Sequence, residues 1–333
     1  MKAGLINIAD RVLNRPLMVH PDKLAIIASV LDGRIGIDAS GLTAAALPST
    51  RTASKGDNPY FSRRGDGVAV IPIVGSLVNR TGGLDAVSGL CSYEHVRRSL
   101  NAAANDEDIS TIALDIDSAG GEAVGAFEIA AHVRAVAKLK PVMASVTGLC
   151  CSAAYAIGSA SSQITVSPSS LVGSIGVVML HLDRSRRLDQ EGIVPTLIHA
   201  GKHKVDGNPL QPLSDDVRED LQAEINYFYS MFVDTVAVGR PRLTPEDIRA
   251  TEARTYIGGI AVTVGLADAV GTLADVVSGL SGMDRKARSK PFDKYQMAAR
   301  LYGDAEAISR QIKDAHLAGT RAGMAAAMRE GKR

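Results

Sequence analysis

Short apolar runs alternate with longer amphipathic stretches between residues 67 and 281. The runs are too short for helices, and most are apolar without alternation, as in strands that are covered on both faces. The longer stretches repeat apolar residues at helical spacing. This order predicts βαβ units and therefore an α/β fold with a mostly parallel sheet flanked by helices. We expect strands at 68–74, 112–116, 142–146, 164–166, 175–180 and 196–198.

Three helices are predicted most clearly. Residues 123–139 and 215–238 each carry apolar side chains along one stripe. In Thr244-Pro-Glu-Asp247 the hydroxyl can cap a helix, the proline suits its first position and the acid its third. A short helix should therefore begin at Pro245.

Composition divides the chain into three parts. Residues 48–66 are polar and rich in turn formers, as in a linker. We expect an N-terminal segment and linker over 1–66, a core domain over 67–281, and a basic, partly helical tail over 282–333. From residue 284 onward, 12 Lys and Arg stand against 6 Asp and Glu.

Charge and cysteine content narrow the class of protein. The 37 Lys and Arg nearly balance the 36 Asp and Glu, so neither nucleic acid nor an anionic membrane is expected as a partner. Three cysteines fit neither a disulfide framework nor a zinc site. Asp10 and Arg11 interrupt the place where an export signal would be apolar, and no run is long enough to span a bilayer. We expect a soluble, unexported protein with no bound metal.

A serine follows the apolar run 142–146, in the stretch Gly148-Leu-Cys-Cys-Ser152-Ala-Ala-Tyr155. The small residues after it predict a strand that turns into a helix at Ser152. Backbone amides at such a turn can stabilise negative charge beside the hydroxyl. Small residues at tight junctions more often serve packing, so this stretch alone is weak evidence for a nucleophile.

A pair of glycines ends the preceding predicted strand, in Asp117-Ser-Ala-Gly120-Gly121. Glycines there let backbone N–H groups approach a ligand closely, although most such pairs only make tight turns. Open α/β sheets bind ligands at the carboxyl ends of their strands, and both this pair and Ser152 are expected at that edge.

Two lysines and two histidines follow in His199-Ala-Gly-Lys202-His203-Lys204-Val-Asp206. A lysine acts as a base only when burial lowers its pKa from about 10.4 toward neutrality. Loop lysines are usually solvated, and these residues alone do not decide between Lys202 and Lys204. A Ser-His pair also stays open, with Asp206 as the evident carboxylate to orient a histidine.

Taken together, five segments resemble the signal peptide peptidase A family of Ser-Lys peptidases, also called the protease IV family. The resemblance covers residues 67–277 and implies a fold like that of Clp protease and crotonase. Residues 14–37 and 201–209 are most similar to phage and prophage head-maturation proteases of the lambda protein C type. The five segments are DIDSAGGE (115–122), GLCCSAAYAIGSAS (148–161), VGSIGVVM (172–179), HAGKHKVDGNP (199–209) and AVTVGLADAVG (261–271).

The resemblance assigns roles by position. It makes Ser152 the nucleophile, Lys204 rather than Lys202 the base, and Ser174 the residue that orients the lysine. The backbone amides of Gly121 and Ala153 would form the oxyanion hole. The residues expected to bind the substrate backbone are Gly120, Gly173, Ile175 and Gly176.

The resemblance implies a serine endopeptidase that needs no cofactor and cleaves capsid-assembly proteins, namely the scaffold, the portal or itself. It also implies a homo-oligomer in the host cytoplasm or the phage prohead and virion. Three other readings stay open: a general peptidase of signal-peptide remnants, a crotonase-type acyl-CoA enzyme, and a capsid assembly protein without catalytic activity.

Three departures from the family pattern affect these expectations. Asp117-Ser-Ala-Gly-Gly121 stands where the family usually has Asn-Ser-Pro-Gly-Gly, so the turn loses a stiff proline and gains an acid. Ala153 and Ala154 replace the glycines of many members, which predicts a narrow pocket and a small residue, such as Ala, before the cleaved bond. A short basic tail stands where lambda-type proteins often continue into a scaffolding region.

Overall fold

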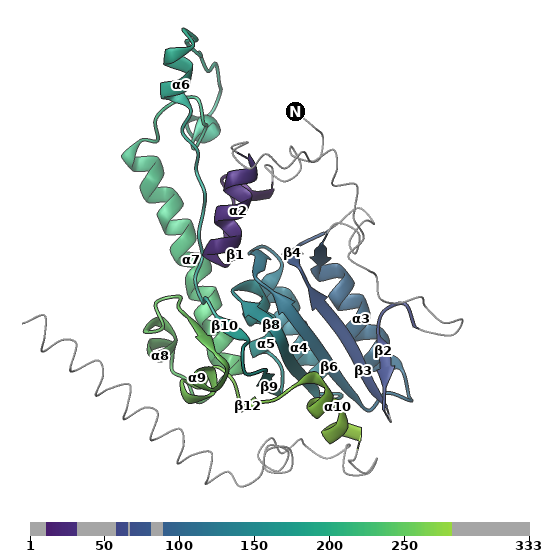
Figure 1. The fold of residues 1–333 in the computed structure, drawn as a ribbon. Coiled ribbons are helices and arrows are strands. Elements are labelled where there is room, and N and C mark those ends of the chain that lie inside the picture. The colour runs from purple at the N-terminus through teal and green to yellow at the C-terminus, as the bar shows by residue number, and fades with distance from the viewer. Residues whose placement is uncertain (1–10, 32–57, 66, 81–88, 282–333) are drawn as a thin grey trace, which may run out of the picture.

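The computed structural model describes residues 11–31, 58–65, 67–80 and 89–281 (Figure 1). Within these residues, an eight-stranded sheet has the order β11-β10-β8-β6-β3-β2, and β9 and β12 extend it beside β8. A smaller sheet has the order β1-β7-β4-β5. Helices flank the larger sheet, so the expected α/β class with a mostly parallel sheet is confirmed.

The strands of the larger sheet are β2 (Ser62–Arg64), β3 (Val68–Val74), β6 (Thr111–Ser118), β8 (Val142–Cys151), β9 (Gln163–Val166), β10 (Leu171–Gly173), β11 (Thr255–Ile257) and β12 (Ala269–Val270). Those of the smaller sheet are β1 (Leu17–Val19), β4 (Ser76–Val78), β5 (Leu90–Ser92) and β7 (Gly120–Glu122). The helices are α2 (Pro21–Leu31), α3 (Tyr93–Asn105), α4 (Ala126–Ala137), α5 (Ala153–Ser159), α6 (Ser185–Gln190), the 3-10 turn η2 (Lys202–Val205), α7 (Asp215–Gly239), α8 (Pro245–Arg249), α9 (Gly258–Thr263) and α10 (Leu273–Ser281).

Strands β3, β6 and β8 form the parallel centre of the larger sheet. Successive side chains of a strand point to opposite faces, so each strand contributes to two apolar layers. Ala69 and Ile71 face the main core with α3, α4 and α5, whereas Val68 and Val70 face a smaller cluster with α10. Burial on both faces explains why these strands read as unbroken apolar runs.

The predicted helices are confirmed with small changes at their ends. α4 buries Ala126, Ile129, Ala130, Val133 and Val136 along one stripe. α7 begins after Ser214, whose side chain accepts a hydrogen bond from the amide of Val217. α8 has the expected capping box: Thr244 Oγ1 accepts from the amide of Asp247 at 3.1 Å, and Asp247 Oδ2 accepts from the amide of Thr244 at 2.9 Å.

Two expected strands are wrong. Residues 175–180 do not form a strand, and their β-pairing is limited to isolated bridges at Val178 and Leu180. Residues 196–198 are also irregular, and Ile198 is 96% exposed. Both runs are apolar enough to suggest strands. Among the described residues, however, the run 175–180 pairs only at isolated bridges, such as Val178 with Leu17, and no ladder includes residues 196–198.

The segment 181–214, which we call the arm, connects the sheet with α7 and contains α6 and η2. Figure 1 shows α6 at the far end of the arm, well away from the sheet. Val194 is 86% exposed and Ile193 47% exposed, in addition to Ile198. Ile193 and Val194 are adjacent in the chain, and neighbouring exposed apolar side chains are typical of surfaces that another protein covers.

The three-part division of the chain stays a prediction. Residues 32–57 and the tail 282–333 lie outside the described residues, including the helical stretch expected near the C-terminus. The described part of the N-terminal segment packs on the core through β1, and the predicted linker contains strand β2. No helix among the residues that the structure describes is long and apolar enough to cross a membrane.

Candidate active site

Ser152 lies at the sharp turn between β8 and α5, as the sequence predicts. Its backbone has φ 58° and ψ −120°, a left-handed conformation that is costly for a residue with a side chain. The turn is held because the Ser152 amide donates to the Gly173 carbonyl at 2.8 Å. The Ser152 hydroxyl lies 3.5 Å from the Gly176 carbonyl oxygen, and the residue is fully buried in the single chain. Strained strand-to-helix turns of this kind present the nucleophile in many hydrolases.

The glycine pair lies beside this turn. Gly120 has φ 93°, and a methyl group on it would lie 2.9 Å from the Cys151 carbonyl oxygen and 3.0 Å from the Ala153 amide nitrogen. Ser118, which the sequence reasoning missed, fixes the bend: its hydroxyl donates to the Gly75 carbonyl at 2.6 Å and accepts from the Gly120 amide at 3.2 Å. The signal in the sequence that could have identified Ser118 is its position two residues before Gly120.

Gly121 must be a glycine for a reason that is independent of catalysis. It is paired with Leu77 of β4, and a methyl group there would lie 2.6 Å from the Leu77 carbonyl carbon and 2.7 Å from its amide nitrogen. Any side chain would therefore push β4 away from β7. Gly121 therefore contacts β4, whereas the neighbouring Gly120 contacts the Ser152 turn.

The segment Gly173–Gly176 closes the other side of the turn. Gly173 pairs with Cys151 through β10 and β8, and Ser174 is buried with φ 52°. The Ser174 amide donates to the Arg254 carbonyl at 2.9 Å, and the Gly176 amide donates to the Ser174 carbonyl at 2.9 Å. Ile175 is buried in the main core. The structure thus brings the predicted substrate-binding residues next to Ser152.

Asp117, the acid that departs from the family pattern, has a structural contact. Its Oδ1 accepts from the Leu149 amide at 2.9 Å, and a methyl group on Gly148 would collide with its carboxylate. Asp117 therefore links the end of β6 to the stretch that leads to Ser152.

Lys204 does not join these residues within the single chain. It lies on η2 in the arm, is exposed, and comes from the part of the molecule that extends away from the sheet (Figure 1). Within the described residues, the hydrogen-bond partner of the Ser152 hydroxyl is the Gly176 carbonyl and no lysine. Lys202 is equally exposed. The histidine alternative is no nearer, because His203 and His199 are also exposed residues of the arm.

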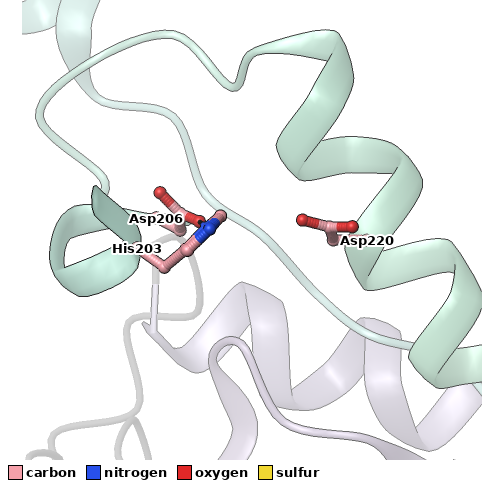
Figure 2. A group of neighbouring side chains, drawn as sticks. All are labelled: His203, Asp206 and Asp220. Atoms are coloured by element: carbon pink, nitrogen blue, oxygen red, sulfur yellow. Dashed lines mark hydrogen bonds and ion pairs between the residues drawn. The ribbon is translucent and has the colours of Figure 1, made fainter. Parts of the chain in front are cut away.

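Three possible metal-ligating side chains gather near Lys204. His203, Asp206 and Asp220 have ligand atoms within 4.8 Å of one another, and His203 Nδ1 lies 2.8 Å from Asp206 Oδ2 (Figure 2). Histidine and carboxylate are possible ligands for a divalent cation. All three side chains are exposed, and solvated groups of this kind commonly pair without a metal. The contact does bring η2 close to α7.

The two cysteines before Ser152 are poor nucleophiles. Both are buried, and burial raises the pKa of the Cys151 thiol to about 12. Burial also raises the pKa of the Cys150 thiol well above its usual value. Only the thiolate is reactive, so both side chains are inert at neutral pH.

Comparisons with known proteins indicate the family of this chain. Residues 134–286 match the model of peptidase family S49. The chain is 36% identical to the capsid assembly protease C of Escherichia phage lambda over 288 residues, which are 83% of this chain and 65% of that protein. Residues 134–286 therefore form a peptidase family S49 domain, and the resemblance of the chain to the signal peptide peptidase A family and to its lambda protein C type is confirmed.

Two further relatives extend the picture. The head-tail preconnector protein GP5 of Enterobacteria phage P21 is 33% identical, with 84% of this chain and 57% of that protein covered. Protease 4 of Salmonella typhi is 31% identical over 52% of this chain and 28% of that protein. The chain therefore spans 65% and 57% of the two phage relatives. Among solved structures, a mutant of ClpP1 from Listeria monocytogenes overlaps 62% of this chain and 94% of its own, with 15% identity and a TM-score of 0.39.

Proposed function

We propose that this protein is a serine endopeptidase of phage head maturation, with Ser152 as nucleophile and Lys204 as general base. The observation that carries the proposal is the strained, left-handed Ser152 between the glycine pair of β7 and the Gly173–Gly176 segment. The match to peptidase family S49 and the name of the lambda relative support the reaction class. The substrates would be capsid-assembly polypeptides such as a scaffold or portal protein, or this chain itself.

The proposed reaction is an acyl transfer. Ser152 attacks a peptide carbonyl carbon while Lys204 accepts the hydroxyl proton, and the Gly121 and Ala153 amides bind the oxyanion. The C–N bond then breaks, and Lys204 returns the proton to the leaving amine. Water, deprotonated by the same lysine, hydrolyses the acyl-serine and restores Ser152. Ser174 would hold the lysine ammonium by a hydrogen bond, and no metal or cofactor is required.

From the exposed position of Lys204 we infer that the base would come from a second copy of the chain. A lysine becomes a base when a dry environment disfavours its charged form, whereas Lys204 is exposed in the single chain. The arm that carries it also exposes Ile193, Val194 and Ile198. Docking of the arm against a neighbouring copy would bury these side chains and place Lys204 near Ser152. Homo-oligomerisation would then be a condition for activity.

The place where the protein acts follows from the same proposal. The names of the lambda and P21 relatives refer to capsid assembly and to the head-tail preconnector. A protein that processes such partners would act in the host cytoplasm, in the prohead or in the virion. Co-expression with the neighbouring capsid and portal proteins, with and without Ser152→Ala, tests this: shortening of a partner chain that depends on Ser152 supports the capsid role.

The catalytic assignment is tested by labelling with a fluorophosphonate. Covalent labelling at Ser152 is expected in the assembled wild type and is expected to disappear in Ser152→Ala. A Lys204→Ala variant should lose labelling and peptide hydrolysis by several orders of magnitude, whereas Lys202→Ala is the matched control and should retain both. Loss of activity in Lys202→Ala with retention in Lys204→Ala would contradict the assignment.

The same experiment separates the other readings. A crotonase-type enzyme, which acts through its glycine-built oxyanion hole without a nucleophilic serine, would give no Ser152 label. A capsid assembly protein without catalytic activity would also remain unlabelled and would leave every partner chain intact.

A further inference from the structure

Residues 13–20 run between the two edges that flank Ser152. On one side, β1 pairs antiparallel with β7, with Met18 opposite Gly121 and Val19 opposite Gly120. On the other side, the Leu17 amide donates to the Val178 carbonyl at 2.8 Å, and the Val178 amide donates to the Leu17 carbonyl at 2.9 Å. The segment is thus hydrogen-bonded along both edges, as an extended peptide is when it binds by strand addition.

The carbonyl of Met18 lies at the glycine pair beside the Ser152 turn. Antiparallel strands exchange both backbone hydrogen bonds at every second opposed pair. The His20 amide donates to the Ala119 carbonyl at 2.8 Å, so the next pair of this type is Met18 with Gly121. A methyl group on Gly120 would overlap the Met18 carbonyl oxygen and would lie 3.0 Å from the Ala153 amide nitrogen. The Met18 carbonyl therefore lies close to both proposed oxyanion donors.

The side chains of β1 alternate between two faces, as those of an extended bound substrate would. Met18 is fully buried and belongs to the main core cluster that includes Ala153 and Ala154. Leu17 and Val19 point to the opposite face and form a separate cluster with α2 and Val178. An unbranched side chain of the length of methionine therefore fits next to the Ser152 turn, which favours a longer residue there than alanine.

Polar contacts hold the segment at one end. Arg11 Nη1 donates to Glu122 Oε1 at 2.6 Å, and Arg11 Nη2 donates to the Arg80 carbonyl at 2.9 Å. Asn14 has φ 52° and donates through Nδ2 to the Gly207 carbonyl at 2.8 Å. These anchors are side chains at the surface, so the strand can be weakened without a change in the core.

We propose that residues 13–20 occupy the substrate groove as a built-in, substrate-like strand, with Met18 before the position of the cleaved bond. A polypeptide substrate enters only when this strand leaves, and the groove accepts extended segments with an unbranched apolar residue at the Met18 position. This inference rests on the proposed function, because it takes the Gly121 and Ala153 amides as the oxyanion donors.

The test measures binding rather than catalysis. The probe is a fluorescein-labelled peptide NRPLMVHPDK, the sequence of residues 14–23, and the protein carries Ser152→Ala. A second substitution, Arg11→Ala, removes the anchor to Glu122. Arg63→Ala is the matched control, because Arg63 also pairs with two groups, Asp106 at 2.7 Å and Asp108 at 3.0 Å, away from the groove.

Since the apparent Kd equals the intrinsic Kd divided by the open fraction, releasing the strand should tighten peptide binding. We expect a Kd about tenfold lower for Arg11→Ala than for Arg63→Ala, which corresponds to about 1.4 kcal/mol. Replacing the methionine of the peptide by aspartate should abolish binding. Asn14→Ala, which puts alanine at a positive φ, is a second releasing variant in case Arg11→Ala folds poorly.

Equal affinities for the released and control variants, with both folded by thermal melting, would overturn the inference and make β1 a permanent part of the fold. Fluorophosphonate labelling of the wild type is scored separately. Labelling at Ser152 with equal peptide affinities would refute the occupied groove alone, whereas tighter binding without any labelling would refute the peptidase alone.

Discussion

Two inactive variants of this protein should restore activity when they share an oligomer. Ser152→Ala removes the nucleophile and Lys204→Ala removes the base, so neither variant alone should cleave. If the arm of one copy supplies Lys204 to the Ser152 of its neighbour, a mixed oligomer contains complete sites. The exposed position of Lys204 and the uncovered apolar residues of the arm lead to this expectation.

The expected magnitude follows from random assembly. In an equal mixture, half of the chains keep Ser152, and half of their neighbours keep Lys204. About one quarter of the sites are therefore complete, whether the copies form a closed ring or a reciprocal dimer. The assay is hydrolysis of a fluorogenic peptide after co-expression or co-refolding of the two variants, normalised to the same amount of wild type.

A second mixture distinguishes sharing from a site within one chain. Wild type mixed equally with the double variant Ser152→Ala/Lys204→Ala should keep about one quarter of the activity if the site is shared and about half if each chain has its own. Native mass spectrometry confirms that the chains mix. No recovered activity in mixed oligomers of the two single variants would refute the shared site.

Four further predictions concern single features. Gly121→Ala should lower the free energy of unfolding by about 1–3 kcal/mol, because the new methyl group collides with Leu77. It should also reduce peptide hydrolysis. Urea unfolding and a peptide assay measure the two effects, and unchanged stability would contradict the collision. Arg240→Ala should cost about 3–5 kcal/mol in the same unfolding measurement, because it strands the Asp268 carboxylate that Arg240 contacts at 2.6 and 2.9 Å; a loss below about 1 kcal/mol would argue against this. Iodoacetamide at about pH 8 should leave Cys151 unmodified in the native protein and peptide hydrolysis unchanged, because the Cys151 pKa of about 12 keeps the thiol protonated. Mass spectrometry that finds a carbamidomethyl group on Cys151 would contradict this. EDTA should not change hydrolysis, and a loss that zinc or calcium reverses would instead assign a metal to the histidine and carboxylates of Figure 2.

Much of the fold could be predicted from the sequence because its main elements are locally encoded. The parallel strands appear as continuous apolar runs such as residues 68–74, since both faces are covered. The helix at Pro245 is encoded by four consecutive residues that satisfy its first amides. The turn at Ser152 is equally local: an apolar strand followed at once by small residues.

The parts that could not be predicted depend on distant neighbours. β1, β4 and β7 have three residues each, and β1 pairs with β7 across about one hundred positions, so neither strand has a pattern of its own. The apolar run 196–198 indicates a strand only if something covers it, and among the described residues of this chain nothing covers Ile198. The proposed approach of Lys204 to Ser152 would likewise depend on how copies of the chain assemble, and spacing along one chain does not encode that assembly.

The contact between Asn14 and Gly207 has a consequence for timing. Asn14 belongs to the segment that leads into β1, and Gly207 belongs to the loop that follows Lys204. One polar contact thus connects the strand that we propose to occupy the substrate groove with the loop that follows the proposed general base. Release of this N-terminal strand would open the substrate groove and also break the contact to the loop after Lys204. The protein would therefore remain inactive until the strand is released.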